Sequence, residues 1–181
     1  YKHLADIACQ RITDAIVARY VGEKPIVPLL DPYNPEGSTR GVNFTTSRSR
    51  YRTNPERCHV NWAVLDSGWE GEFCRAVEDH PAVRSYVKNH SLGFEVPYRM
   101  GSVAKKYRPD FIVRIDDGHG PDDLLNLVVE IKGRRGEDAQ VKATTLQDYW
   151  VKSVNHHGGY GRWEAVEFTD AYAIESDFAA T

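Results

Sequence analysis

The sequence predicts a mixed α/β fold, an α+β core in which one sheet combines antiparallel and parallel strands. Three observations predict it. Residues 92–133 hold three apolar runs of strand length, separated by links that contain glycine or proline. Apolar residues recur at helical spacing on either side, over 66–81 and 138–155, and a fourth strand-like run follows at 162–170. The first three strands can form a meander, and the second helix then crosses over to place the last strand.

Length and composition indicate one folded domain of ordinary size. The chain has 181 residues, of which 41% are hydrophobic, and this is enough to bury a core. A net charge of −3 argues against a protein that binds polyanions non-specifically. No apolar run reaches the length of a membrane span and no signal-peptide pattern opens the chain, so we expect no membrane partner. The unclustered Cys9, Cys58 and Cys74 fit neither a disulfide framework nor a zinc site, which favours a reducing, cytoplasmic protein.

Residues 1–63 are predicted to form an extension that precedes the core domain, 64–181. Apolar spacing predicts an amphipathic helix over 3–21, and four prolines in 25–38 predict a connector. Two strand-like runs within 42–65 predict a β-hairpin. Because the first residue is a tyrosine and not a methionine, we expect the chain to be a piece of a longer protein.

Six elements make up the predicted core. They are a helix over 66–81, strands over 92–100, 108–115 and 124–133, a helix over 138–155 and a strand over 162–170. Ser67 is the expected N-cap of the first helix, and Pro81 is its expected stop. The first strand is predicted from the alternation of Leu92, Phe94 and Val96 with less apolar residues.

Charged residues interrupt two of the predicted strands. Asp110 stands directly before Phe111, and Glu130 and Lys132 lie within the third apolar run. A hairpin turn centred near residue 120 would set Asp110 opposite Glu130, with Cβ atoms about 5 Å apart. Two carboxylates at that separation repel one another unless a cation lies between them. We therefore interpret Asp110 and Glu130 as metal ligands.

The chemistry of these side chains indicates a hard cation and a hydrolytic reaction. Carboxylates without a nearby histidine or cysteine favour Mg²⁺, with Mn²⁺ as a substitute, over Zn²⁺. Lys132 emerges on the same face of its strand as Glu130, because side chains alternate along a strand. Its ammonium can orient a water molecule and stabilise developing charge. This combination is typical of phosphodiester hydrolysis.

Pro109-Asp110 followed by Glu130-Ile131-Lys132 resembles the motif of the PD-(D/E)XK nuclease superfamily. The surrounding sequence, over about 64–170, resembles the C-terminal endonuclease domain of the restriction subunit of type III restriction enzymes. The resemblance implies an αβββαβ core and a metal-dependent endonuclease domain that acts on double-stranded DNA.

The resemblance also implies partners outside this chain. An ATP-driven helicase motor would lie upstream in the same polypeptide, with the extension as the joint, and a methyltransferase subunit would recognise the DNA sequence. ATP would serve that motor alone, because these residues contain no G-x-x-x-x-G-K-[ST] phosphate loop.

The resemblance implies roles for individual residues. Asp110 and Glu130 would hold the metal, with the backbone carbonyl of Ile131 as an extra ligand. Lys132 would position or activate water. The rival interpretations are a repair or recombination nuclease of the same superfamily and a non-catalytic DNA-binding or assembly module on this fold.

A further acid is expected from the first core helix. In the superfamily this helix often supplies an acid-x-x-apolar pattern, which Glu70 and Phe73 match. Glu70 has an equally good alternative, because with Ser67 it forms a capping box in which it accepts the Ser67 backbone N–H. Glu72 is a weaker candidate.

Basic and polar residues close to the acids are candidates for contacts with DNA phosphates. They are Lys105, Lys106, Arg108, Arg134, Arg135, Lys142 and Gln147. For Lys142, a solvated helix face is the commoner alternative.

Overall fold

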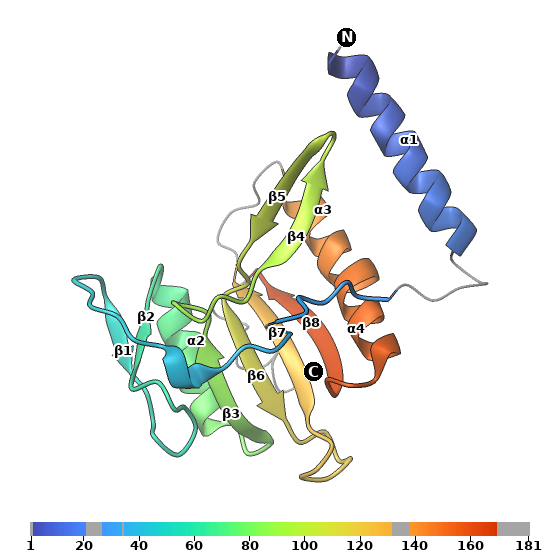
Figure 1. The fold of residues 1–181 in the computed structure, drawn as a ribbon. Coiled ribbons are helices and arrows are strands. Elements are labelled where there is room, and N and C mark those ends of the chain that lie inside the picture. The colour runs from blue at the N-terminus through green and yellow to red at the C-terminus, as the bar shows by residue number, and fades with distance from the viewer. Residues whose placement is uncertain (1, 21–26, 34, 132–137, 170–181) are drawn as a thin grey trace.

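The computed structural model describes residues 2–20, 27–33, 35–131 and 138–169 (Figure 1). A four-stranded mixed sheet forms the centre, with a helix packed on each face and two short hairpins beside it. The predicted α+β class with a mixed sheet is confirmed. Within the described ranges, no helix combines the length and the apolar character that crossing a membrane requires.

The sheet has the strand order β3-β6-β7-β8. Its strands are β3 (Val83–Lys88), β6 (Phe111–Ile115), β7 (Leu125–Ile131) and β8 (Arg162–Phe168). Strand β6 runs antiparallel to both β3 and β7, whereas β8 runs parallel to β7. A parallel pair needs a crossover connection, and the helical segment between β7 and β8 provides it.

The first strand of the sheet differs from the predicted one. The stretch 92–100 forms β4 (Val96–Met100), which pairs with β5 (Val103–Tyr107) in a separate hairpin. The place expected for it in the sheet is taken by β3. The prediction was wrong because Arg84 and Lys88 interrupt the apolar pattern of β3, and a charged residue within a strand usually indicates a solvated edge.

The hairpin of β6 and β7 has the register that the sequence predicts. Phe111 pairs with Val129 and Val113 with Leu127, so the pairing is centred on residue 120. The turn contains Gly118 and Gly120, with φ angles of 96° and 94°. Glycine adopts these positive φ values at little energetic cost, which explains why the turn forms here.

The two predicted core helices are confirmed. They are α2 (Gly68–Asp79) and a continuous helical segment made of α3 (Ala139–Thr144), the π-helical turn η2 (Thr145–Val151) and α4 (Lys152–His157). Backbone angles stay right-handed helical at Thr144 and Val151, where these parts join. The segment ends at Gly158, whose φ of 72° is typical of a glycine that terminates a helix.

The extension contains α1 (Lys2–Tyr20), a single 3₁₀ turn η1 (Thr39–Gly41), and the hairpin of β1 (Arg50–Arg52) and β2 (Trp62–Val64). The predicted helix and hairpin are thus confirmed. Helix α1 lies beside the β4–β5 hairpin, away from the sheet, and Asp6 accepts hydrogen bonds from the backbone and the hydroxyl of Ser102 (Figure 1). Leu4 and Ile12 are 66% and 60% exposed, so the apolar stripe of α1 is not buried against the described residues.

Two clusters of buried side chains lie on opposite faces of the sheet. One lies between α2 and the sheet and includes Phe73, Val77, Phe111 and Val129. The other lies under the α3–η2 segment and includes Val96, Tyr107, Val128 and Leu146.

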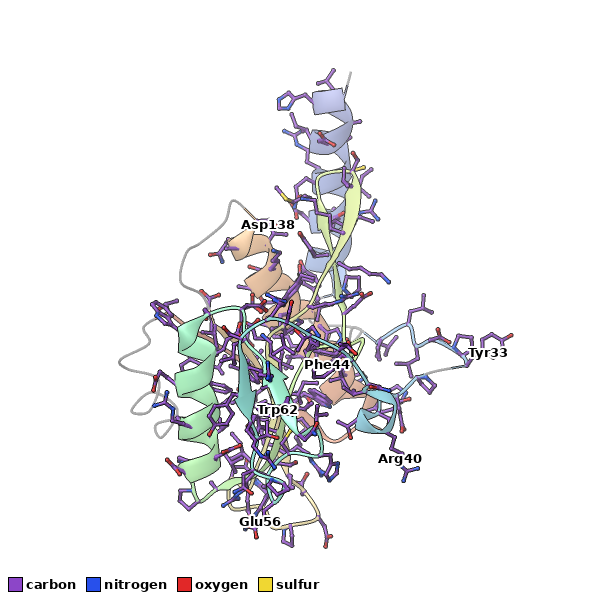
Figure 2. All side chains as sticks on the ribbon, turned by 90° about the vertical axis from the view of Figure 1, so that its left-hand side faces the viewer. Tyr33, Arg40, Phe44, Glu56, Trp62 and Asp138 are labelled. Carbon is purple, nitrogen blue, oxygen red and sulfur yellow. The ribbon has the colours of Figure 1, made fainter. Side chains whose placement is uncertain are left out.

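The β1–β2 hairpin of the extension packs on the core. Its residues Cys58 and Ala63 belong to the cluster between α2 and the sheet, and Figure 2 shows this hairpin beside α2. The domain boundary at residue 63 stays a prediction.

Candidate metal centre

Three carboxylates meet where α2 crosses the end of the sheet. Asp66, Glu70 and Asp110 each offer an oxygen atom, and these atoms lie within 4.8 Å of one another. Asp66 precedes α2, Glu70 lies in its first turn, and Asp110 precedes β6. Residues that are far apart in the sequence come together because α2 packs its apolar face on β6. We call these three residues the acidic cluster.

A lysine lies within the acidic cluster. The ammonium nitrogen of Lys88, the last residue of β3, is 3.0 Å from Glu70 Oε2, 3.2 Å from Asp110 Oδ1 and 3.5 Å from Asp66 Oδ2. It also lies 4.9 Å from the centre of the Phe111 ring. The Lys88 side chain is only 6% exposed. Sequence analysis missed Lys88 and Asp66, because β3 was not recognised and Asp66 has the appearance of a turn residue before a helix.

Backbone N–H groups orient two of the three acids. Asp110 Oδ2 accepts the N–H of Ile131 at 2.7 Å, and Glu70 Oε2 accepts the N–H of Asp66 at 2.9 Å. The predicted capping box is therefore corrected, since Glu70 bonds to the residue before Ser67. Ser67 itself makes no side-chain cap hydrogen bond within the described part of the chain. Glu70 combines a capping contact with membership of the acidic cluster.

A buried asparagine holds the backbone on which Asp110 stands. The Asn89 N–H donates to the Asp110 carbonyl at 2.8 Å, and its side-chain amide donates to the carbonyls of Pro109 and Phe94 at 2.9 and 2.7 Å. These bonds tie the start of β6 to the loop that follows β3. Such outer contacts fix the orientation of a ligand before a metal binds.

Burial opposes the negative charge of the cluster. Desolvation raises the pKa of Glu70 above its ordinary value, and the charge of Asp110 acts in the same direction, while the Lys88 ammonium partly offsets both. Glu70 is 3% exposed. A nearby cation therefore favours the ionised form of this carboxylate.

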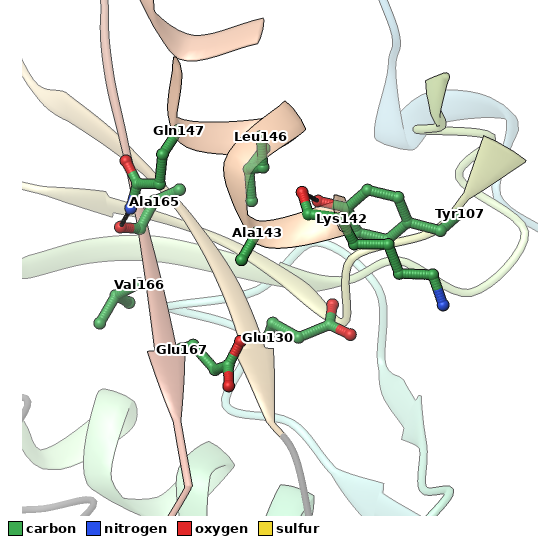
Figure 3. A pocket seen from close by; sticks show the side chains of 9 residues that line it. All are labelled: Tyr107, Glu130, Lys142, Ala143, Leu146, Gln147, Ala165, Val166 and Glu167. Atoms are coloured by element: carbon green, nitrogen blue, oxygen red, sulfur yellow. Dashed lines mark hydrogen bonds between the residues drawn. The ribbon is translucent and has the colours of Figure 1, made fainter. Parts of the chain in front are cut away.

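The Glu130 side chain lies elsewhere. It lines a pocket under the α3–η2 segment, opposite Glu167 of β8 in the parallel register (Figure 3). Tyr107 lines the same pocket, and its pKa is raised by burial and then by the charges of Glu130 and Glu167. Alternation along β7 places Glu130 on the face of Val128, whereas Asp110 precedes its strand and can turn towards α2. The structure brings Asp110 together with Asp66 and Glu70, not with Glu130.

The candidate phosphate-binding residues in β5 and directly after it already contact other side chains. Lys106 and Arg108 pair with Glu95 at 3.1 and 2.7 Å, and both are well exposed. Lys105 is exposed and its ammonium lies 3.5 Å from the sulfur of Met100. All three lie on the β4–β5 hairpin or directly after it, so they form one basic edge there.

The candidates on the second helix are held within the fold. The Lys142 ammonium lies 3.1 Å from Asp138 and over the rings of Tyr98 and Tyr107. Gln147 donates a hydrogen bond to the carbonyl of Ala165 (Figure 3). Both side chains therefore contact other parts of the fold, which differs from the solvated helix face given above as the alternative for Lys142. Three further candidates, Lys132, Arg134 and Arg135, lie outside the described residues.

Two residues that sequence analysis did not single out as site residues border the cluster. Arg48 forms an ion pair with Asp66, and both side chains are about half exposed. Burial, followed by the charges of Arg48 and Lys88, lowers the pKa of His90. The His90 ring meets that of Phe44 edge-on at 4.8 Å, so this contact joins the segment before β1 to the loop that follows β3. Because these contacts join segments far apart in the sequence, no local pattern signals them.

The donor set fits a hard divalent cation. The acidic cluster offers only carboxylate oxygens, which Mg²⁺ and Mn²⁺ prefer, and its atoms are close enough together to share one ion. Asp66, Glu70 and Asp110 would be the protein ligands. Comparison with family models, with curated proteins and with solved structures gives no match for this chain. The resemblance to type III nucleases therefore rests on the sequence motif.

Glu70→Gln is expected to weaken Mn²⁺ binding about tenfold or more, since even residues that only orient a ligand contribute this much to metal affinity. Glutamine keeps an oxygen that accepts the Asp66 N–H but loses the charge, so capping and metal binding are separated. The matched control is Glu72→Gln on the same helix, where the glutamate is exposed and paired with Arg75. Calorimetric titration of both variants measures the effect. Equal affinities for both variants would mean that Glu70 acts only as a cap.

Proposed function

We propose that this chain is a metal-dependent DNA endonuclease domain that hydrolyses phosphodiester bonds, the nuclease part of a type III restriction-modification enzyme. The observation that carries the proposal is the meeting of Glu70 and Asp110 in one acidic cluster. Asp110 had been selected from its place before a strand, and Glu70 from the acid-x-x-apolar pattern of the superfamily that the motif resembles. The order of a helix, three sheet strands, a helix and a last strand agrees with the αβββαβ core of the PD-(D/E)XK superfamily.

The described residues supply a preorganised ligand set. Asp66, Glu70 and Asp110 would hold Mg²⁺, or Mn²⁺ in its place. When bound, the ion supplies Lewis-acid polarisation of a phosphoryl oxygen and lowers the pKa of a water molecule. The N–H groups of Ile131 and Asp66 keep the Asp110 and Glu70 carboxylates in place.

Three further residues are included in the proposal because the PD-(D/E)XK sequence motif assigns them a role. Glu130 stands next to Val129, the partner of Phe111, so its backbone lies at the same end of the sheet as Asp110. Its side chain would have to turn from the Tyr107 pocket to reach the acidic cluster, and the ion would have to stabilise that orientation. The Ile131 carbonyl would be an extra ligand. Lys132 would orient or activate the attacking water.

DNA binding is proposed to involve the basic residues around the cluster. Arg48 is half exposed and lies at the cluster itself, and the basic edge of the β4–β5 hairpin extends from the same end of the sheet. Each phosphate contact adds affinity that falls with salt concentration. With a net charge of −3, the chain is expected to bind duplex DNA weakly by itself. An upstream helicase motor and a methyltransferase subunit would deliver the DNA.

One observation favours a second candidate function, a non-catalytic DNA-binding or assembly module. The Lys88 ammonium contacts all three acids of the cluster, so they have an internal counter-ion and can serve as a buried ion-pair network. Such a network loses stability when one partner is removed. A change at Asp110 would then reduce the stability of the protein and leave DNA processing by the assembly intact.

The 181-residue chain is expected to cut plasmid DNA slowly, without sequence preference, and only with added Mg²⁺ or Mn²⁺. The reason is its net charge of −3, with which we expect few phosphate contacts and therefore weak DNA binding at physiological salt. The measurement is nicking of supercoiled plasmid without ATP, with the Asp110→Asn chain as the control. Joined to the motor and the methyltransferase, the domain should cut efficiently with ATP. Rapid cleavage at defined sites by the chain alone would indicate a self-sufficient endonuclease instead.

A further inference from the structure

The Lys88 ammonium occupies the place at which the acidic cluster would bind a cation. We propose that Lys88 is an internal counter-ion of the metal-free protein, and that a divalent metal binds by displacing its ammonium from the three carboxylates. This inference rests on the metal centre of the proposed function.

The distances from the Lys88 nitrogen to the three acids indicate that Lys88 and a metal ion would compete for the same carboxylates. The Lys88 nitrogen lies within 3.5 Å of an oxygen from each of Asp66, Glu70 and Asp110. One ligand atom from each of these acids lies within 4.8 Å of the others, so an ion bound to all three would lie among the carboxylates that Lys88 contacts. Two cations at such a short separation repel strongly in a partly buried site. Full metal binding and the present position of Lys88 therefore exclude one another.

Burial explains why the metal-free protein needs this ammonium. Glu70 and Lys88 are both buried, and a buried carboxylate without a counter-charge is strongly destabilising. On the exposed side Asp66 has Arg48 as a second cationic partner. On the buried side Lys88 is the cation that contacts Glu70 and Asp110 among the described residues. Lys88 thus stabilises the fold before a metal arrives.

The length of the Lys88 side chain allows its ammonium to move away from the carboxylates. In the present position the nitrogen also lies over the face of the Phe111 ring, and this aromatic face helps to hold it there. Its four-carbon side chain is flexible, whereas its backbone is fixed by pairing with Phe111 in the sheet. A divalent ion gains more than an ammonium from the same three carboxylates, because it carries twice the charge. The cluster should therefore select divalent over monovalent cations.

The test uses the 181-residue chain, without DNA. In calorimetric titration, Lys88→Met should bind Mn²⁺ about tenfold more tightly than the wild type, because the competing charge is gone. Without metal this variant should unfold at a lower temperature than the wild type, and Mn²⁺ should raise its unfolding temperature by more. The matched control is Lys106→Met, which removes an exposed lysine and should leave the Mn²⁺ affinity unchanged. Affinity that is unchanged or weaker in Lys88→Met overturns the inference.

A second measurement uses the wild-type protein. It tests the inference even where the Lys88→Met variant fails to fold. Lys88 should react slowly with an amine-acylating reagent in the metal-free protein and faster at saturating Mn²⁺, as followed by mass spectrometry of its peptide. No increase at saturation overturns the inference. Absence of Mn²⁺ binding by both wild type and variant overturns the metal centre as well. Tighter Mn²⁺ binding by Lys88→Met than by the wild type, with no DNA cleavage by the complete wild-type enzyme, supports the inference and contradicts the nuclease proposal.

Discussion

Asp110→Asn is expected to reduce Mg²⁺-dependent DNA cleavage by the complete enzyme roughly 10²-fold or more, because it removes a charged metal ligand. The substitution preserves the size of the side chain and leaves an oxygen that can accept the Ile131 N–H, so the hairpin end should stay in place. Cleavage of plasmid under single-turnover conditions measures the loss. Asp122→Asn, in the exposed turn between β6 and β7, is the matched control and should retain full activity.

The same variant separates the two candidate functions. A nuclease should lose cleavage even at temperatures at which the Asp110→Asn protein is fully folded, because a metal ligand is missing. A structural module should lose stability, because Lys88 keeps its charge with one ion-pair partner fewer, and cleavage should be retained wherever the variant is folded. Full cleavage by Asp110→Asn would place the catalytic site elsewhere in the protein.

Phe73→Ala is expected to lower the free energy of unfolding by about 3–5 kcal/mol, as is typical when a buried aromatic side chain is truncated. Phe73 is fully buried, and its ring lies 4.8 Å from that of Phe111 and 5.8 Å from that of Phe168. It therefore joins α2 to both an inner and an outer strand of the sheet. Urea denaturation of the 181-residue chain measures the loss.

The control for this prediction lies on the same helix. Arg75→Ala removes an exposed side chain and should change the unfolding free energy by less than about 0.5 kcal/mol. Because Phe73 positions the helix that carries Glu70, its truncation should also weaken Mn²⁺ binding. A loss of stability below about 1 kcal/mol would contradict the packing of α2 on the sheet, since such burial normally contributes far more.

Local signals in the sequence determined most of the elements and one register. The helix before Pro81, the long second helix and the last strand all follow from the spacing of apolar residues. The pairing of Phe111 with Val129 is centred on residue 120, within the connection whose glycines the sequence analysis identified as a turn. Asp110 and Glu70 could be selected as site residues because each stands in a recognisable local pattern.

Only the tertiary structure decided which strand begins the sheet and which groups surround Asp110. Strand β3 was missed because a terminal Lys88 looks like a solvated edge, yet Glu70 of α2 and Asp110, directly before β6, supply the charges that allow its burial. The direction of Glu130 likewise depends on which helix covers each face of the sheet, and a linear pattern contains no such information. Whether a charged side chain can be buried depends on which oppositely charged groups surround it in the folded protein. For Lys88 those partners come from segments that meet only when α2 packs on the sheet.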